Sequence, residues 1–303
     1  MPETMWAIVL AGGEGSRLRA LARDQRGLPA PKQFCPLGGR RPPLAAALER
    51  AERLVPRERI VVSVVEAHRG WWADQLADRE PGNIVSQPHP RGTAAGVLLP
   101  LLRVLARDPE ASVLVLPADH AVEDEAVLAQ ALGRAAWVAR QRPGDVVLLG
   151  VTPTSADPEF GWVVPAGERD ADSQRVASFV EKPGPELARR LMASGAMWNA
   201  FLISATGRAL LQLFRRHLRA LHAGLVTIDG DPEEPPGAPA ASRPFQSLPT
   251  HDLSRDLLTP ASSNLRVVRV PPCGWTDLGT PTRLEEWLAS QLAPLSAGGL
   301  GPA

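Results

Sequence analysis

The chain has 303 residues, 44% of them hydrophobic and 22% charged, which is enough apolar material for one large domain or two small ones. Its formal net charge is zero, so we expect no nucleic-acid or anionic-membrane partner, and any phosphate ligand must be held by local groups. No stretch reaches the roughly 18 apolar residues of a membrane span, and the apolar run at 5–11 lacks the basic leader of a signal peptide. These features predict a cytoplasmic protein.

Strands and helices alternate through the first half of the sequence. Short apolar runs rich in β-branched residues predict buried strands at 6–10, 60–65, 113–116 and 146–151. Helical spacing is found at 43–55, 70–76, 94–106 and 125–140, where Pro100 predicts a kink or an early end of the third helix. The alternation predicts an α/β fold with a mainly parallel sheet covered by helices on both faces.

The rhythm changes in the second half. Shorter strands are predicted at 160–164, 176–180 and 201–204, and helices at 185–193 and 205–223, which suggests a mixed extension of the same sheet. A Pro-rich stretch at 231–244 predicts an exposed loop, and it precedes a helical segment at 252–258, a strand at 265–270 and a last helix at 281–291. We expect one domain over 1–290 and a disordered tail at 291–303.

The first predicted strand runs into the sequence LAGGEGSRL at 10–18. Its three glycines let the backbone curl so that N–H groups face a phosphate, and Arg17 adds positive charge. The P-loop pattern fails because no Gly-Lys-Ser/Thr follows, and the dinucleotide pattern fails because Leu18 stands at the third glycine position. The loop thus indicates a phosphate site, although a bare glycine turn would have the same composition.

Only two of the 33 basic residues are lysines, and both stand in short motifs: Lys32 in Pro-Lys-Gln-Phe and Lys182 in Glu-Lys-Pro. A bias against AT-rich codons explains why lysines are few, but it leaves their placement open. An ammonium group is compact whereas a guanidinium is broad and planar, so a tight phosphate pocket accepts one and rejects the other. The two positions therefore predict anion-binding sites.

With the Pro-Lys-Gln-Phe motif at 31–34, the chain resembles the sugar-1-phosphate nucleotidyltransferases, most closely the mannose-1-phosphate guanylyltransferases, whose signature loop ends in these four residues. The resemblance spans roughly residues 6 to 290. It is carried further by QPHPRGTA at 87–94, LPADH at 116–120, EFGW at 159–162, FVEKP at 179–183, WNAF at 198–201 and GWTDLG at 274–279. It implies one catalytic domain with the Rossmann-like, mixed and mainly parallel sheet of the nucleotide-diphospho-sugar transferases. The β-helix or cupin-like extension of many relatives is not expected in this chain.

The resemblance also implies which residues bind the two substrates. The nucleotide-binding residues would be Leu10, Ala11, Gly12, Gly13, Gly15, Ser16, Arg17, Lys32, Gln87, Gly92 and Thr93, the last three facing the base. Those that bind the sugar phosphate would be Gly161, Glu181, Lys182 and Asn199. Thr93 could instead cap the helix that follows, Glu181 could be a surface strand residue and Asn199 a turn residue.

Two aspartates are the candidate ligands of a metal ion. Asp119 follows a buried strand and would project into the crevice at the carboxyl end of the sheet, where Asp277 could meet it. Two carboxylates with phosphate oxygens and water would suit Mg²⁺, although Asp119 could instead cap a helix and Asp277 form a turn. His120 is expected to support this site. Cys35 and Cys273 have no paired spacing and are expected to be unpaired thiols.

The implied reaction is Mg²⁺-dependent attack by the phosphate oxygen of α-D-mannose 1-phosphate on the α-phosphorus of GTP, giving GDP-mannose and pyrophosphate. The attacking phosphate is already ionised, so the protein has mainly to align two anions and screen their repulsion. The catalytic set would be Arg17, Lys32, Asp119, Lys182 and Asp277.

Some features leave the specificity open. The segment at 22–30 is longer than the family's usual loop, and the chain has no tyrosine, so Phe160 and Trp162 stand in the sugar-contacting turn. Alternatives are glucose 1-phosphate with dTTP or UTP, a nucleotide-sugar sensor without catalysis, a cytidylyltransferase of the methylerythritol phosphate type, and, least supported, an NAD-dependent dehydrogenase. The oligomeric state is also left open.

Overall fold

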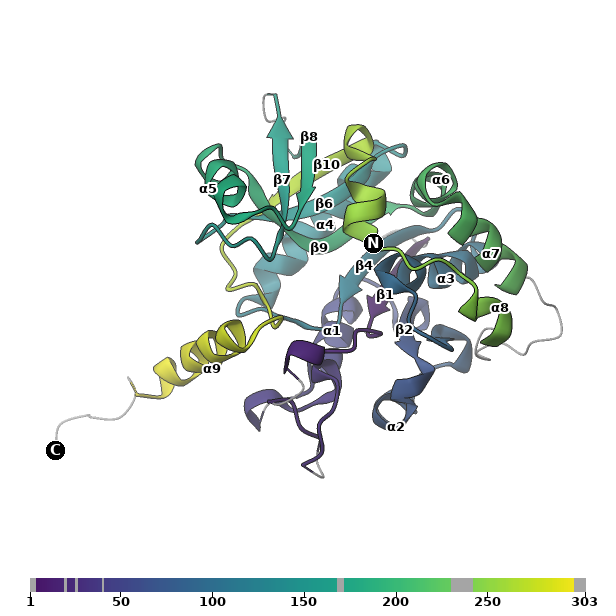
Figure 1. Cartoon of the computed structure of the whole chain (residues 1–303), viewed down its shortest axis with the longest axis horizontal. Coiled ribbons are helices and arrows are strands. Elements are labelled where there is room, and N and C mark those ends of the chain that lie inside the picture. Colours follow the sequence, from purple (N-terminus) through teal and green to yellow (C-terminus); the bar gives the residue numbers. More distant parts are fainter. Residues whose placement is uncertain are drawn as a thin grey trace.

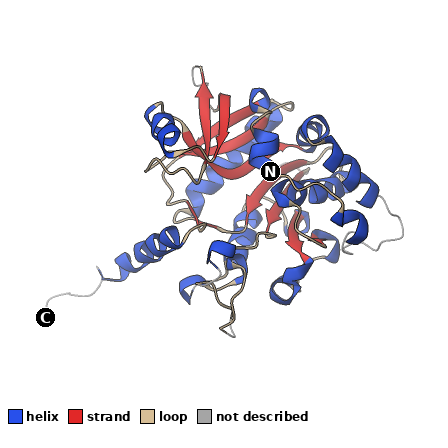
Figure 2. Ribbon diagram, viewed as in Figure 1, coloured by secondary structure: helices blue, strands red, loops and turns tan. Residues whose placement is uncertain are grey.

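The computed structural model describes residues 4–18, 21–24, 27–39, 41–167, 172–229 and 242–296. A twisted nine-stranded sheet runs through the molecule, with helices packed on both sides of it (Figures 1 and 2). In spatial order its strands are β3 (Ile84–Gln87), β2 (Ile60–Val65), β1 (Met5–Leu10), β4 (Ser112–Pro117), β9 (Met197–Thr206), β6 (Val146–Val151), β10 (Leu265–Val270), β8 (Gln174–Glu181) and β7 (Gly161–Ala166).

The first four strands of that order form a parallel half. β1 pairs in parallel with β2 and β4, and β2 pairs in parallel with β3. These strands are buried on both faces because consecutive residues of β1 enter different cores: Ile8 packs with α3 (Gly92–Arg107), whereas Val9 packs with α1 (Pro43–Glu52) and α4 (Glu125–Gln141). The predicted α/β architecture is confirmed. β3 was not predicted, since only Ile84 and Val85 of its four residues are apolar.

The remaining strands form a mixed half, as the changed rhythm predicts. β9 is antiparallel to both β4 and β6, while β10 is parallel to β6. β7 pairs with β8 and also with β9, where Trp162 lies opposite Trp198, so this half curls back on itself. A separate two-stranded ribbon joins β5 (His120–Ala121) to β11 (Thr276–Asp277). The remaining helices are α2 (Arg69–Trp72), α5 (Pro185–Ala193), α6 (Gly207–His217), α7 (Arg219–Asp229), α8 (Ser242–Gln246) and α9 (Pro281–Ser296).

Several predicted boundaries are wrong. α3 continues past Pro100, which is itself buried in the face that packs on the sheet. The single helix predicted at 205–223 is two helices, because the backbone leaves the helical conformation at Leu218. The helix expected at 252–258 is a π-helical turn at Ser254–Leu258.

The predictions of an exposed loop at 231–244 and of a disordered tail at 291–303 are also partly wrong. Residues 230–241 lie outside the described part of the chain, but α8 begins inside the stretch expected to be a loop. α9 runs to Ser296, past the expected start of the tail at 291. Its first turns pack against other elements through Leu284, and in Figure 1 its far end extends away from them. Residues 297–303 are not described.

Two further expectations from the sequence, unpaired cysteines and the lack of a membrane span, can be compared with the described residues. Both cysteines, Cys35 and Cys273, are buried and free. Within the described ranges, no helix combines the length and the apolar character needed to cross a membrane.

Candidate functional site

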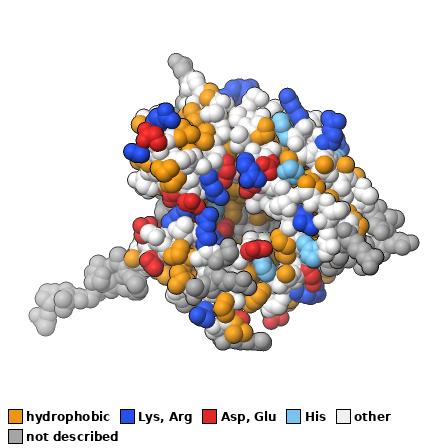
Figure 3. All heavy atoms as spheres, viewed as in Figure 1, with side chains coloured by type: hydrophobic (Ala, Val, Ile, Leu, Met, Phe, Trp, Pro, Cys, Tyr) orange, Lys and Arg blue, Asp and Glu red, His pale blue; other side chains and the backbone are white. Residues whose placement is uncertain are grey.

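A cavity of about 450 Å³ opens at the carboxyl ends of the parallel strands, between the two halves of the sheet. In Figure 3 it is the hollow near the centre, with acidic and basic side chains around it. The predicted site residues that line it are Leu10, Gly12, Gly13, Gln87, Gly92, Thr93, Asp119, Gly161, Glu181, Lys182, Asn199 and Asp277. The fold thus brings together residues that are up to 267 positions apart in the sequence, Leu10 and Asp277.

The glycine loop forms one wall of the cavity through Gly12 and Gly13. Gln33 holds it in place, because its side-chain Nε2 donates hydrogen bonds to Ala11 O at 3.0 Å and to Gly13 O at 2.7 Å. Gly15 adopts a φ of +60°, and a Cβ there would lie 3.2 Å from the backbone nitrogen of Lys32. Gln33, the third residue of Pro-Lys-Gln-Phe, was not predicted to act at the site, although its place in that motif was a usable signal.

The remaining predicted nucleotide residues lie outside the cavity wall. Ala11 is buried beneath the loop, where its N–H donates to Ser63 O, and Ser16 begins the short 3₁₀ turn that contains Arg17. The Arg17 guanidinium lies at the rim, 2.7 Å from the carboxylate of Glu159, which lines the cavity. Direct phosphate contacts by these residues stay predictions.

Lys32 lies behind the cavity wall and is buried. Its Nζ is 2.9 Å from Asp119 Oδ2 and donates a hydrogen bond to Leu278 O at 2.5 Å. The ammonium group therefore ties the segment after β4 to the residue after β11. A direct contact between Lys32 and the leaving phosphates stays a prediction.

Asp119 and Asp277 meet because the strand that follows Asp119 pairs with β11. His120 lies opposite Asp277 in that ribbon, and the N–H of Leu278 donates to Asp119 O at 3.1 Å. Both carboxylates line the cavity, and that of Asp277 is held by the guanidinium of Arg283 from α9. Burial is the largest single effect and raises the pKa of the Asp119 carboxyl. The smaller effects of the Lys32 ammonium, of His120 and of hydrogen bonds together outweigh burial and lower the pKa, so this group is an anion at neutral pH.

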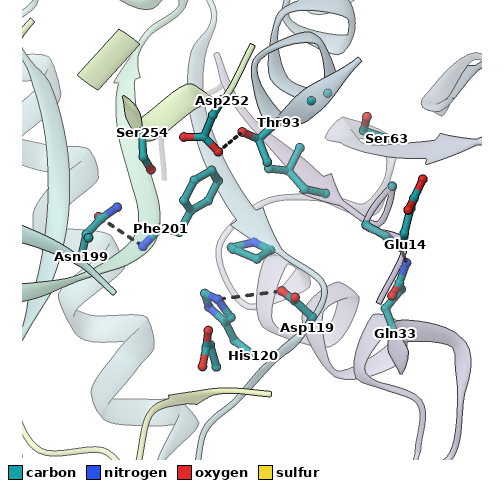
Figure 4. Close-up of a pocket in the computed structure, with 18 of the residues that line it drawn as sticks. Glu14, Gln33, Ser63, Thr93, Asp119, His120, Asn199, Phe201, Asp252 and Ser254 are labelled. Carbon is teal, nitrogen blue, oxygen red and sulfur yellow. Dashed lines mark hydrogen bonds and ion pairs between the residues drawn. The ribbon is translucent and has the colours of Figure 1, made fainter. Parts of the chain in front are cut away.

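His120 supports the carboxylate pair, as predicted, without being charged. Burial lowers its pKa to about 4, so the imidazole is neutral at pH 7. The Nε1 of Trp275 donates a hydrogen bond to His120 Nδ1 at 3.3 Å. The Nε2 of His120 lies 3.9 Å from Asp119 Oδ1 (Figure 4). The ring is thus held between the candidate metal-site aspartate and an aromatic wall.

One end of the cavity surrounds Gln87, at the end of β3. Its Nε2 is 3.4 Å from Ser63 Oγ, while its Oε1 is buried and has no hydrogen-bond partner among the described residues. Gly12 and Gly96 leave room beside this amide, since a Cβ on either would come within 3.6 Å of Nε2. Ser63 and Gly96 were not predicted, because nothing in their local sequence marks them.

Thr93 belongs to the same end and is not a helix cap. α3 begins at Gly92 with Arg91 as its N-cap residue. The Thr93 hydroxyl instead accepts a hydrogen bond from the N–H of Leu253 at 2.7 Å and lies 3.4 Å from Asp252 Oδ2 (Figure 4). It therefore joins the start of α3 to a segment that follows it by 160 residues.

The opposite end contains the predicted sugar residues. Glu181 ends β8 opposite Gly161, and a Cβ on Gly161 would lie 2.7 Å from Glu181 Oε2. Lys182 has a φ of +46° and places its Nζ 3.7 Å from Glu181 Oε1. Asn199 is buried, and its Oδ1 accepts from the N–H of Phe201 at 3.2 Å. Glu181 is thus a cavity residue, and the surface-strand alternative is wrong.

Glu181 has an unusual acidity for a glutamate. Burial and the nearby carboxylate of Asp252 raise its pKa to about 6, against the opposing effects of Lys182 and a hydrogen bond from Ser254. Asp252 and Ser254 both line the cavity, and neither was predicted. Their local sequence indicated only a helix, so no signal pointed to the site.

The comparisons with known proteins agree with this geometry. The nucleotidyl transferase family model matches residues 6–292. A mannose-1-phosphate guanylyltransferase of Escherichia coli strain K12 is 35% identical over 241 residues, 75% of this chain and 49% of that protein. Mannose-1-phosphate guanylyltransferase 2 of E. coli O157:H7 is 30% identical over 292 residues, 90% of this chain and 58% of that protein.

Among solved structures, a Thermus thermophilus protein named mannose-1-phosphate geranyltransferase superposes with a TM-score of 0.78 and 31% identity, over 91% of this chain and 76% of that one. The chain spans between 49% and 58% of the length of the two E. coli relatives. The resemblance stated from the motifs is confirmed, and the chain belongs to the nucleotidyl transferase family.

Proposed function

We propose that the chain transfers a guanylyl group from GTP to α-D-mannose 1-phosphate, with Mg²⁺, to give GDP-mannose and pyrophosphate. The observation that carries this proposal is that one cavity contains a glycine loop, a pair of aspartates and a sugar-type polar cluster, in that order across the sheet. The names of the E. coli relatives support mannose 1-phosphate and the guanylyl group as the substrates.

The nucleotide would lie along the parallel half. Its base fits the end at Gln87, where a buried amide oxygen lacks a partner among the described residues and where N–H groups of guanine would supply donors. The triphosphate would then follow the backbone of Gly12 and Gly13, toward Arg17 at the rim. This direction leaves the α-phosphorus near Asp119.

The sugar phosphate would lie in the mixed half. Asn199 and ionised Glu181 provide an amide and a carboxylate for sugar hydroxyls, while Lys182 provides an ammonium for the phosphate. The phosphate oxygen would attack the α-phosphorus and the bond to the pyrophosphate oxygen would break. No side chain has to remove a proton, because the attacking group is already an anion.

The aspartate pair fits a magnesium site. Asp119 and Asp277 offer hard oxygen donors at the point where the two substrates would meet, and each has one carboxylate oxygen that its basic partner does not hold. A bound Mg²⁺ would neutralise charge on the phosphates. Within the described residues, no group of three or more acidic, His or Cys side chains is placed to hold a metal ion, so substrate oxygens and water would complete the octahedron.

The test is pyrophosphate release by the purified protein with Mg²⁺. Mannose 1-phosphate and glucose 1-phosphate are each crossed with GTP, dTTP, UTP, CTP and ATP, with Asp119→Asn as the control. We expect release with mannose 1-phosphate and GTP, and its loss in the control. Release confined to another pair would change the substrates but keep the reaction, whereas no release by folded protein would favour a nucleotide-sugar sensor.

A further inference from the structure

Phe201 adopts a backbone conformation that disfavours its side chain. Its φ is +52°, and Lys182 is the other non-glycine residue with positive φ in the described ranges. The residue lies where β9 bulges against β6: Asn199 is opposite Gly150, whereas Ile203 is opposite Leu148. Between these two pairs, one residue of β6, at 149, faces three of β9, at 200–202. A left-handed conformation favours glycine, so an aromatic residue there indicates a local constraint.

The bulge directs the aromatic ring to the cavity. Phe201 lines the cavity and is partly buried against the core that includes α3. In Figure 4 its ring lies beside Asp252, in the space between Asn199 and Thr93. Asn199 belongs to the sugar end and Thr93 to the base end, so the ring borders the space where a sugar would sit.

The same bulge orients a polar neighbour. The N–H of Phe201 donates to Asn199 Oδ1, which fixes the direction of that amide. The side chain's NH₂ group is then the part left to contact a ligand hydroxyl. The strained backbone at Phe201 therefore fixes the orientation of two groups, the aromatic ring of Phe201 and the side-chain amide of Asn199.

We propose that Phe201 determines which sugar 1-phosphates the cavity accepts; this inference rests on the proposed function. The ring offers an apolar surface to the C–H face of a hexose and occupies volume that a glycine would leave to a larger substituent. Plain hexose 1-phosphates are bound in preference to those that carry an acetamido group in place of a hydroxyl. Phe201 is a specificity-determining residue and takes no part in bond making.

The experiment measures binding by calorimetry, so that it does not depend on turnover. Protein saturated with α,β-methylene GTP, which cannot release pyrophosphate, is titrated with mannose 1-phosphate and with N-acetylmannosamine 1-phosphate. We expect Phe201→Gly to weaken mannose 1-phosphate binding about tenfold and to reduce the preference over the acetamido sugar by at least about tenfold. The Kd of the nucleotide analogue should change less than about twofold.

Two further variants separate specificity from structure. Phe201→Leu keeps most of the volume, so it should still exclude the acetamido sugar while binding mannose 1-phosphate more weakly. Asparagine tolerates a positive φ, so Phe201→Asn replaces Phe201→Gly in the experiment if the glycine variant does not fold. The inference is overturned if a folded variant without the ring keeps the wild-type preference, or if both sugars and the nucleotide weaken equally.

The inference and the proposed function fail in different ways. Turnover by the wild type with no change of preference in the variants would overturn the inference alone. A protein that binds mannose 1-phosphate and loses that preference in Phe201→Gly, but releases no pyrophosphate, would overturn the proposed catalysis alone. Wild-type protein that binds the nucleotide analogue and neither sugar phosphate would overturn the inference.

Discussion

The two ends of the cavity are built by different means. At the nucleotide end the walls are mostly backbone and small side chains at the carboxyl ends of parallel strands, with glycines at 12, 13, 92 and 96. At the sugar end the walls are mostly side chains on antiparallel strands or directly after them. Two of these residues, Lys182 after β8 and Phe201 in β9, have left-handed backbone.

The specificity of each end should follow from how it is built. A backbone-built end is a product of the fold itself and binds groups common to all nucleoside triphosphates. A side-chain-built end depends on the identity of a few residues and can change its ligand by substitution. We therefore expect substitutions where the two ends meet to abolish the reaction, and substitutions of side chains at the sugar end to affect mainly the binding of the sugar phosphate.

The largest effect is expected where the two ends meet. Asp119 follows β4, which lies between β1 of the nucleotide half and β9 of the sugar half. Asp119→Asn removes one of the two charged candidate metal ligands, and we expect turnover to fall by at least about a thousandfold, equivalent to about 4 kcal/mol. Asp78→Asn is the control, because Asp78 pairs with Arg57 on the surface. Turnover within about tenfold of the wild type would exclude Asp119 from the catalytic centre.

The nucleotide end could be predicted from sequence more completely than the sugar end. Its strands carry continuous apolar runs, and its glycine loop follows the first strand directly, so the motif and its position in the sheet are both local features. The meeting of Asp119 with Asp277 was expected from the resemblance and from the rule that strand ends converge. The pairing of β5 with β11, which brings the two together, has no signal in two-residue strands.

The sugar end depends on contacts that no local pattern contains. Asp252 and Ser254 reach the cavity because the N–H of Leu253 bonds to Thr93 and because His251 packs on Gly92. The strain at Phe201 comes from the unequal pairing of β9 with β6, which depends on the folded sheet. Sequence reasoning therefore found Gly161, Glu181, Lys182 and Asn199 through the resemblance, and it missed Asp252 and Ser254.

The two lysines differ in their surroundings, one at each end. The scarcity of lysine in the chain suggests the same role for both. Lys32, however, is buried, and its Nζ contacts Asp119 Oδ2 and Leu278 O, whereas the side chain of Lys182 is 52% exposed. The buried site of Lys32 has no room for a guanidinium. Lys32→Arg should therefore lower kcat about a hundredfold, and it should also lower the Tm. Lys182→Arg should raise the KM for the sugar phosphate about tenfold and leave the Tm unchanged.

Steady-state kinetics and thermal melting of the two variants test this difference. Equal losses of kcat with equal changes of Tm would mean that the two lysines occupy similar environments. An unchanged Lys182→Arg enzyme would remove the argument from lysine placement at that site, while the family assignment would stand.

A matched pair of glycines tests the backbone-built end. Gly92 has a φ of +78°, and a Cβ there would lie 2.1 Å from His251 O, so Gly92→Ala should destabilise the protein by about 2–4 kcal/mol. Gly133 lies inside α4 with nothing within 4 Å of an added Cβ, and Gly133→Ala should stabilise by about 0.5–1 kcal/mol. Urea denaturation measures both. Similar changes in the two variants would show that the contact of Gly92 with His251 is absent in solution.

The smallest effect concerns the acidity of Glu181. Because its pKa is raised to about 6, the folded protein holds this proton more tightly than the unfolded chain does. The corresponding stability is complete below the ordinary glutamate pKa and is lost as the pH rises through about 6. Asp252→Asn removes a negative neighbour, lowers the pKa of Glu181 and should move this loss to lower pH.

The same substitution should shift substrate binding. If ionised Glu181 accepts hydrogen bonds from sugar hydroxyls, the KM for the sugar phosphate falls a few-fold as the pH rises through about 6. The substrate's phosphate titrates near the same pH, so one profile cannot identify the group. That titration is identical for wild type and Asp252→Asn, and a midpoint that moves down in the variant is therefore due to the protein. Superimposable KM profiles would mean that Glu181 does not titrate at the sugar end.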